Sequence, residues 1–249
     1  MIFLCFTSKD AREPLQEILC CTEKLEMPVI FDSERLSADE DYDDYNLKGF
    51  QSGIDKAEYA IVLFTPSSVS SACVQEEIHE IYKRYQNKSM MIFPILYGMK
   101  PNELPHKWQN FTKTMYYEAH EKSDISSICN HIISHILMNE LIKYPFREIQ
   151  SFILQNQNVP LMSYPVNLLN AYSMVDDENH KIKVSFLYAL YIYIKNSYNI
   201  NAIPKFYYAG IYKLFDMARL QIPVNAGEVV VLERLMLLLL NAVLFGCLC

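Results

Sequence analysis

The sequence predicts an α/β fold over residues 1–140, with a five-stranded parallel sheet and helices on both faces, followed by an all-α region over 141–249. Short apolar runs alternate with segments of helical periodicity throughout 1–140, as in a parallel sheet with crossover helices. Beyond 141 the strand-like runs give way to helical stretches rich in Tyr, Leu and Ile. The charge balance changes at the same place. Residues 1–140 hold 13 Lys/Arg against 22 Asp/Glu, whereas 141–249 hold 9 against 7.

The predicted elements of the first region follow from local patterns. Strands are expected where short runs are apolar and rich in β-branched or aromatic residues: 2–6, 29–31, 59–64, 90–96 and, more weakly, 114–117. Helices are expected where apolar residues recur every three or four positions: 12–25, 45–57, from 74 onward, and 123–137. Pro101, Pro105 and Trp108 mark an irregular connection between the fourth and fifth strands. The acid-rich stretch 32–44 is expected to be a solvated loop.

The second region is predicted to be helical over 184–198, 203–218 and 228–245, with prolines punctuating 144–165. It holds no catalytic constellation, so an assembly or sensing role is expected. Residues 235–249 are almost wholly apolar, but 15 residues are short of the roughly 20 that cross a bilayer. A buried terminal helix or an oligomer interface is therefore expected in place of a membrane span.

Composition excludes several classes of protein. A hydrophobic content of 51% with 20% charged residues predicts a substantial core and excludes a disordered chain. The acidic first region argues against nucleic acid as a partner. The seven cysteines form no C-x-x-C pair or zinc-type spacing, so no metal site and a reducing cytosol are expected. The N-terminus lacks the basic segment of a secretory signal, which supports the same cytoplasmic location.

The candidate site is the strand-loop-helix unit of residues 61–81. Four apolar residues end at Thr65-Pro66, a serine-rich loop follows, and the next helix carries Glu76 and Glu77 early in its course. Ligands of open parallel sheets bind at such strand-to-helix turns. Adjacent helical residues point about 100° apart, so the two carboxylates are not expected to face one pocket. The simpler alternative is an early-helix acid favoured by the helix dipole, worth about 0.3–1 kcal/mol.

Four segments in this order resemble the TIR (Toll/interleukin-1 receptor) domain family. Residues 3–10 (FLCFTSKD) are similar to its first box and 31–39 (FDSERLSAD) to the second strand entering the BB loop. Residues 65–78 (TPSSVSSACVQEEI) resemble the segment that usually reads Ser-Pro, then Ser, Trp and Glu-Ile, and 91–95 (MIFPI) resemble the fourth strand. The resemblance covers residues 1 to about 138. It departs from the family where Ala-Asp-Glu replaces the usual Pro-Gly turn at 38–40, and where Cys73 replaces the tryptophan.

The resemblance implies a flavodoxin-like fold and, for the bacterial enzymatic members, cleavage of NAD+ at the nicotinamide–ribose bond. Glu77 occupies the position of the catalytic glutamate. Residues that would contact the nucleotide or wall its pocket come from the first loop, the BB loop and the tryptophan position: Phe6, Ser8, Lys9, Asp32, Arg35, Leu36 and Cys73. NAD+ would be the substrate, with no separate cofactor, and the product would be linear or cyclic ADP-ribose. The resemblance further implies activation by self-association through the TIR domain and the C-terminal helices, in anti-phage defence or signalling.

Two other functions stay open at this point. A non-catalytic TIR module would use the acidic loop at 39–44 to dock a basic partner surface. A nucleoside deoxyribosyltransferase-like enzyme would share the α/β architecture and a glutamate at a glycosidic bond, but the order of the boxes disfavours it.

Overall fold

The computed structural model describes residues 1–23, 28–31, 47–113, 115–144, 148–198, 210–212, 214–216 and 224–245. The chain divides into two compact units, Met1–Cys129 and Asn130–Cys249. The division falls within helix α5 (Lys122–Leu141), about ten residues before the change in sequence character at 141.

The first unit contains a five-stranded sheet in the order β2-β1-β3-β4-β5, and every pair of neighbouring strands is parallel. The strands are β1 (Ile2–Cys5), β2 (Val29–Ile30), β3 (Tyr59–Phe64), β4 (Met91–Tyr97) and β5 (Tyr117–Ala119). This is the flavodoxin-like strand order, in which the direction of winding reverses between β1 and β3. The predicted five-stranded parallel sheet is confirmed.

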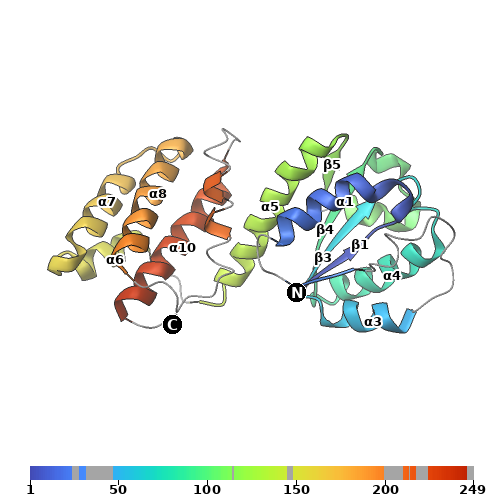
Figure 1. Ribbon diagram of the computed structural model, residues 1–249, viewed down its shortest axis with the longest axis horizontal. Coiled ribbons are helices and arrows are strands. Elements are labelled where there is room, and N and C mark those ends of the chain that lie inside the picture. The colour runs from blue at the N-terminus through green and yellow to red at the C-terminus, as the bar shows by residue number, and fades with distance from the viewer. Residues whose placement is uncertain are drawn as a thin grey trace. The chain divides into compact units, whose positions relative to one another are not determined.

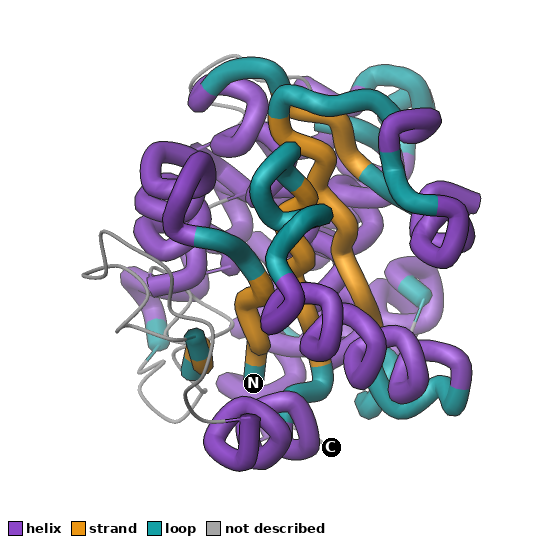
Figure 2. Tube along the Cα trace, turned by 90° about the vertical axis from the view of Figure 1, so that its right-hand side faces the viewer, coloured by secondary structure: helices purple, strands orange, loops and turns teal. Residues whose placement is uncertain are grey.

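Helices cover both faces of this sheet (Figure 1; Figure 2). Helices α1 (Ser8–Glu23) and α5 lie on one face, where the Lys122 ammonium is 3.6 Å from the Glu17 carboxylate. Helices α3 (Leu47–Lys56) and α4 (Ala72–Gln86) lie on the other face. Between β4 and β5 the chain forms two 3-10 helices, η1 (Pro101–Glu103) and η2 (His106–Lys113), in the predicted irregular connection.

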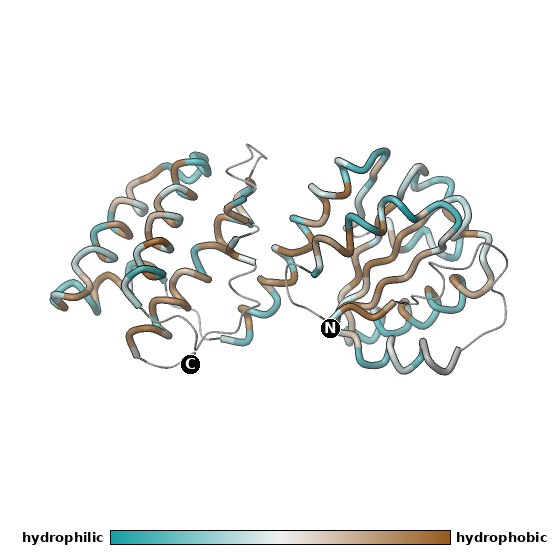
Figure 3. The backbone as a smooth tube through the Cα atoms, viewed as in Figure 1, coloured by the Kyte–Doolittle hydropathy of each residue, from teal (hydrophilic) through white to brown (hydrophobic). Residues whose placement is uncertain are grey.

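The core on the α3–α4 face comes from alternate residues of the strands. Phe3, Ala60, Val62 and Phe64 are 1% exposed or less and pack with buried residues of α3, α4 and η2. Figure 3 shows the apolar residues concentrated along the strands. Strands buried on both faces account for the continuous apolar runs in the sequence.

Several boundaries in this unit differ from the prediction, among them the start of α1 and the position of β5. Helix α1 begins at Ser8, four residues before the periodic pattern starts. Strand β5 lies at 117–119 because these residues pair with 95–97 of β4. Pro94 lies one residue before the part of β4 that pairs with β5. At Pro94, β4 pairs with β3 alone, so the N–H that proline lacks costs no hydrogen bond to β5.

The second unit consists of helices in its described part. They are the part of α5 from Asn130 onward, α6 (Ile149–Asn156), the 3-10 helix η3 (Pro160–Met162), α7 (Ser163–Ser173), α8 (His180–Ser197) and α10 (Ala226–Phe245). Residues 210–212 and 214–216 are also helical, and the rest of the predicted helix 203–218 lies outside the described residues. The prediction missed α6 and α7 because prolines punctuate their region. Pro160 and Pro165 lie in the first turn of η3 and α7, respectively. A backbone N–H in the first turn has no partner within the helix, so the N–H that proline lacks is not missed there.

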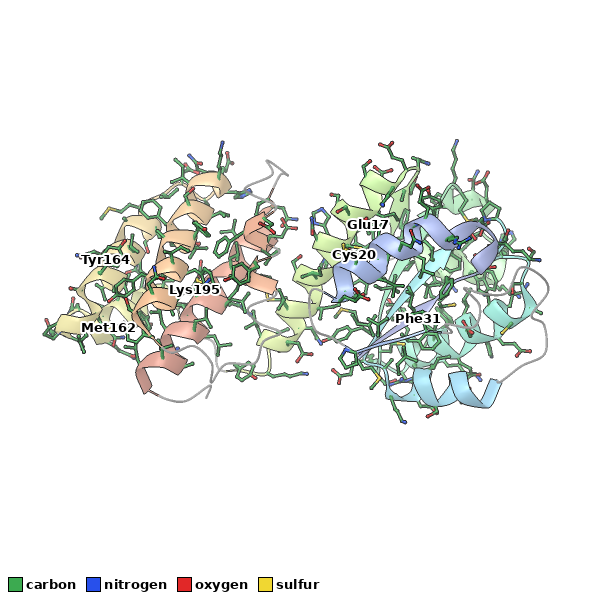
Figure 4. All side chains as sticks on the ribbon, viewed as in Figure 1. Glu17, Cys20, Phe31, Met162, Tyr164 and Lys195 are labelled. Atoms are coloured by element: carbon green, nitrogen blue, oxygen red, sulfur yellow. The ribbon has the colours of Figure 1, made fainter. Side chains whose placement is uncertain are left out.

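Buried leucines of α10 and a small polar network hold α7, α8 and α10 together. The Tyr172 hydroxyl donates a 2.8 Å hydrogen bond to the Glu233 carboxylate, and the Lys183 ammonium lies 5.1 Å over the Tyr172 ring. Burial raises the pKa of Glu233, partly opposed by the Tyr172 hydrogen bond. Tyr164 and Lys195 of this unit are labelled in Figure 4.

Among the described residues, no helix combines the length and apolarity that crossing a membrane requires.

Candidate active site

The site is built on the loop between β3 and α4. The backbone N–H of Thr65 donates to the Ser68 hydroxyl (2.7 Å), and the N–H of Ser68 donates to the Thr65 hydroxyl (3.1 Å). The Ser68 hydroxyl in turn donates to the Thr65 carbonyl (2.9 Å), and both side chains are fully buried. Reciprocal bonds of this kind satisfy the polar groups of a buried turn, so the Thr-Pro-Ser-Ser sequence fixes how the chain leaves the sheet.

Helix α4 then begins with a serine cap. The Ser71 side chain accepts a hydrogen bond from the N–H of Val74, and the Ser71 carbonyl accepts one from the N–H of Gln75 (3.0 Å). Glu77 follows in the second turn and is 3% exposed, on the face of the helix that buries Val74 and Ile78. An almost fully buried carboxylate is rare unless it has a structural or chemical role.

A groove of about 510 Å³ runs along α4, between α3 and η2. Its lining combines acidic, amide and aromatic side chains: Gln51, Ile54, Ala72, Gln75, Glu76, Glu77, His79, Glu80, Lys107 and Trp108. This volume is in the range of small-molecule sites. Both Glu76 and Glu77 line it, so the expectation that they would not share a pocket is wrong. The groove extends around the flank of the helix and reaches the exposed Glu76 as well as the buried Glu77.

Lys107 and Trp108 form a wall of the groove that the sequence did not predict. Trp108 is 3% exposed and packs on Phe64 at a ring-centroid distance of 5.9 Å. The Lys107 ammonium lies 4.8 Å over the Trp108 ring and donates a 2.7 Å hydrogen bond to the Gln75 side-chain oxygen. Cys73, which stands where the TIR resemblance has a tryptophan, is partly exposed and lies outside the groove's lining. The aromatic wall therefore comes from η2, 31 residues after Glu77 in the sequence, and no local pattern indicates it.

The other predicted site residues lie outside the described lining of the groove. Phe6 is 1% exposed and packs on Phe31 at 6.4 Å between ring centroids (Phe31 is labelled in Figure 4). Lys9 is exposed in the first turn of α1, and Ser8 is the first residue of that helix. The three predicted residues of the BB loop lie outside the described part of the chain: Asp32, Arg35 and Leu36. Nucleotide contacts by all of these residues remain predictions.

Asp10 is a further residue at this site that the sequence analysis did not select. One of its carboxylate oxygens accepts a 2.5 Å hydrogen bond from the Thr65 hydroxyl, and the other accepts a 2.8 Å bond from the N–H of Ser67. The carboxylate thus bridges from the first turn of α1 to the loop that leads into α4. The signal in the sequence was the Lys-Asp pair at the end of the first box, which the resemblance matched without giving Asp10 a role.

The charges around the groove are partly compensated. The Lys83 ammonium lies 2.6 Å from the Glu80 carboxylate, and its hydrogen bond lowers the pKa of Glu80. Within the described ranges, no group of three His, Cys, Asp or Glu side chains is placed to hold a metal ion. What the groove offers a ligand is a buried carboxylate at one part of its wall, an oriented ammonium at another, and space for a small molecule between protein surfaces.

Comparisons with known proteins give little beyond this geometry. The sequence matches no family model and no curated protein. Among solved structures, the chain is similar to the TIR domains of the activated Roq1 resistosome that directly recognises the pathogen effector XopQ. The two are 16% identical with a TM-score of 0.35, over 52% of this chain and 82% of that chain. At this TM-score the likeness supports no statement about function, and the fold assignment rests on the strand order of the sheet.

Proposed function

We propose that this protein is a TIR-type NAD+ nucleosidase that cleaves the nicotinamide–ribose bond, with Glu77 as its catalytic residue. The observation that carries the proposal is the burial of Glu77 in the wall of a groove of about 510 Å³, on the helix that follows β3. The position matches the family's glutamate, and the strand order β2-β1-β3-β4-β5 is the one that the resemblance implied.

The chemistry needs little more than a well-placed carboxylate. Cleavage of the bond to a cationic pyridinium builds positive charge on the ribose, as in glycoside hydrolysis, while nicotinamide leaves as a neutral molecule. No acid is therefore needed to protonate the leaving group. A carboxylate held in a poorly hydrated wall stabilises the developing cation more strongly than one in water, because the local dielectric constant is lower. Water or an internal nucleophile then completes formation of linear or cyclic ADP-ribose.

The C-terminal helical unit has a separate part in this proposal. It supplies the self-association that brings the enzyme to its active state, in a defence or signalling role. Its observed helical build is compatible with that part, and the oligomeric state of the purified chain at rising concentration would test it.

The decisive experiment is an NAD+ consumption assay on the full chain with a matched pair of variants. Glu77→Gln keeps the volume of the side chain and removes its charge, and we expect kcat/KM to fall by about 100-fold or more. Glu76→Gln makes the same change on the exposed neighbour in the same groove and should stay within about threefold of the wild type. Nicotinamide release measured by chromatography gives both rates.

Two results would contradict the proposal. One is equal cleavage by the wild type and Glu77→Gln. The other is a wild-type chain that is inert at high concentration and under crowding, which would favour the non-catalytic interaction module if the chain still self-associates.

A further inference from the structure

Asp10 holds two segments of the first unit together at the point where the sheet changes its direction of winding. Its oxygens accept hydrogen bonds from the Thr65 hydroxyl (2.5 Å) and from the N–H of Ser67 (2.8 Å), 55 and 57 residues away in the chain. β1 and β3 are neighbours there, so the start of α1 lies beside the loop that leaves β3. Both distances are in the short range of bonds to an ionised acceptor, which are about twice as strong as neutral ones.

A series of hydrogen bonds leads from Asp10 and Thr65 into α4. Thr65 is locked to Ser68 by three reciprocal hydrogen bonds, and the N–H of Ser71 donates to the Ser68 carbonyl (3.4 Å). Ser71 then caps α4, and the Gln75 side-chain amide returns a 3.1 Å hydrogen bond to the Val69 carbonyl. Each step from Asp10 to the first turn of the helix is thus a hydrogen bond, and Glu77 lies two residues beyond Gln75.

An acid in the first turn of a helix ordinarily serves its own helix by facing the dipole. The Asp10 carboxylate instead has both of its oxygens bonded to a different segment. The Asp10 carboxylate is half-buried. Its main effect is therefore on the position of the β3–α4 loop and not on the stability of α1.

We propose that Asp10 is a positioning residue for Glu77: through Thr65 and Ser67 it fixes the β3–α4 loop and therefore the first turns of α4. The inference rests on the proposed NAD+ nucleosidase, for which a displacement of about 1 Å at a catalytic group costs about 100-fold in rate. Contacts made by a ligand at the β1–α1 loop would reach Glu77 by the same route.

The test compares rate, affinity and local opening in the full chain. Asp10→Asn keeps the shape of the side chain but can offer one acceptor oxygen in place of two. We expect kcat for NAD+ to fall by about 10- to 100-fold with KM within about threefold. Thr65→Val, which removes the donor, should resemble Asp10→Asn, whereas Thr65→Ser retains the hydroxyl and should restore the rate. Glu13→Gln is the matched control, because it removes an exposed charge from the same helix.

A second measurement is independent of NAD+ turnover. Cys73 lies in the first turn of α4, and its modification by a small thiol reagent, followed by peptide mass spectrometry, reports opening of that turn. Asp10→Asn and Thr65→Val should accelerate modification of Cys73 by about tenfold at a temperature well below unfolding, while Glu13→Gln should not. If the wild type does not cleave NAD+, the proposed function has failed and these labelling rates alone decide the role of Asp10. The inference is overturned if Asp10→Asn keeps the wild-type kcat and the wild-type rate of Cys73 labelling. The same holds if a lowered melting temperature is its only effect.

Discussion

Single residues in each unit carry interactions whose removal is measurable. In the helical unit, the His131 Nδ1 atom of α5 lies 2.8 Å from the Glu228 carboxylate of α10. This hydrogen bond raises the pKa of His131 above its usual value of about 6.5, and it outweighs the opposing effect of burial. On the next turn of α5, burial and the neighbouring His131 lower the pKa of His135.

The first prediction concerns the pH dependence of stability. A histidine whose folded pKa is raised stabilises the folded state below its unfolded pKa, and that contribution is lost as pH rises through the folded pKa. We therefore expect the free energy of unfolding of the wild type to exceed that of His131→Gln by up to about 1 kcal/mol at pH 5.5, and to converge with it by pH 8.5. Urea titrations across this range measure the difference. The pKa of His135 is shifted in the opposite direction, so this residue destabilises the folded state as pH falls. His135→Gln should therefore reduce the loss of unfolding free energy at acidic pH. A difference between the wild type and His131→Gln that does not change with pH would contradict the assignment.

The second prediction concerns the aromatic wall of the groove. Trp108 packs on Phe64, which also contacts Phe111 at 5.5 Å between ring centroids. Trp108→Ala removes this buried ring, and we expect a loss of about 3–5 kcal/mol in the stability of the first unit. Trp108→Phe retains an aromatic ring and should lose less than half as much. Thermal unfolding of the pair gives the comparison, and equal melting temperatures would show that the ring is not packed as described.

At the scale of elements, α10 is tied down at its first turn. The Asn225 side-chain oxygen accepts a 3.0 Å hydrogen bond from the N–H of Glu228, and the Glu228 carboxylate accepts a 2.9 Å bond from the N–H of Asn225. This reciprocal arrangement is a capping box, and Glu228 also pairs with His131. The start of the helix is therefore fixed both to its own backbone and to α5.

The third prediction follows from this cap. Asn225→Ala should lower the free energy of unfolding by about 1 kcal/mol, because the first turn of α10 loses its side-chain acceptor. Asn225→Asp preserves an acceptor at the same position and should remain close to the wild type. Denaturant midpoints measure both variants, and an unchanged midpoint in Asn225→Ala would mean that other contacts hold the turn.

The elements also show where sequence patterns were sufficient. The run at 59–64 predicted β3 to the residue, because a strand buried on both faces needs continuous apolar sequence. Helices α6 and α7 were missed because prolines punctuate the region around them, although the proline in the first turn of α7 is compatible with a helix. In the groove, Glu77 was selected from the pattern of its own segment, and its catalytic role stays a prediction. Trp108 and Asp10 were not, because their contacts join segments far apart in the chain.

At the scale of the whole molecule, each unit has buried residues of its own. In the second unit, Leu190 of α8 is 1% exposed, among other buried residues of α7, α8 and α10. We therefore expect Leu190→Ala to cost about 2–5 kcal/mol, and its effect to add to that of Trp108→Ala within about 0.5 kcal/mol in the double variant. Calorimetry on the two single variants and the double variant tests this fourth prediction, and a large deviation from additivity would show that the two sites are energetically coupled.

The burial of Glu77 also has a consequence for how this sequence would drift over generations. Taking a carboxylate out of water is costly, so a buried acid is retained only where it has a role. A copy of the gene that no longer needed the proposed reaction would therefore no longer be selected to keep a charge at position 77 for catalysis. Retention of glutamate there would then mark lineages still under selection for the proposed reaction, and its loss would mark those kept for another purpose.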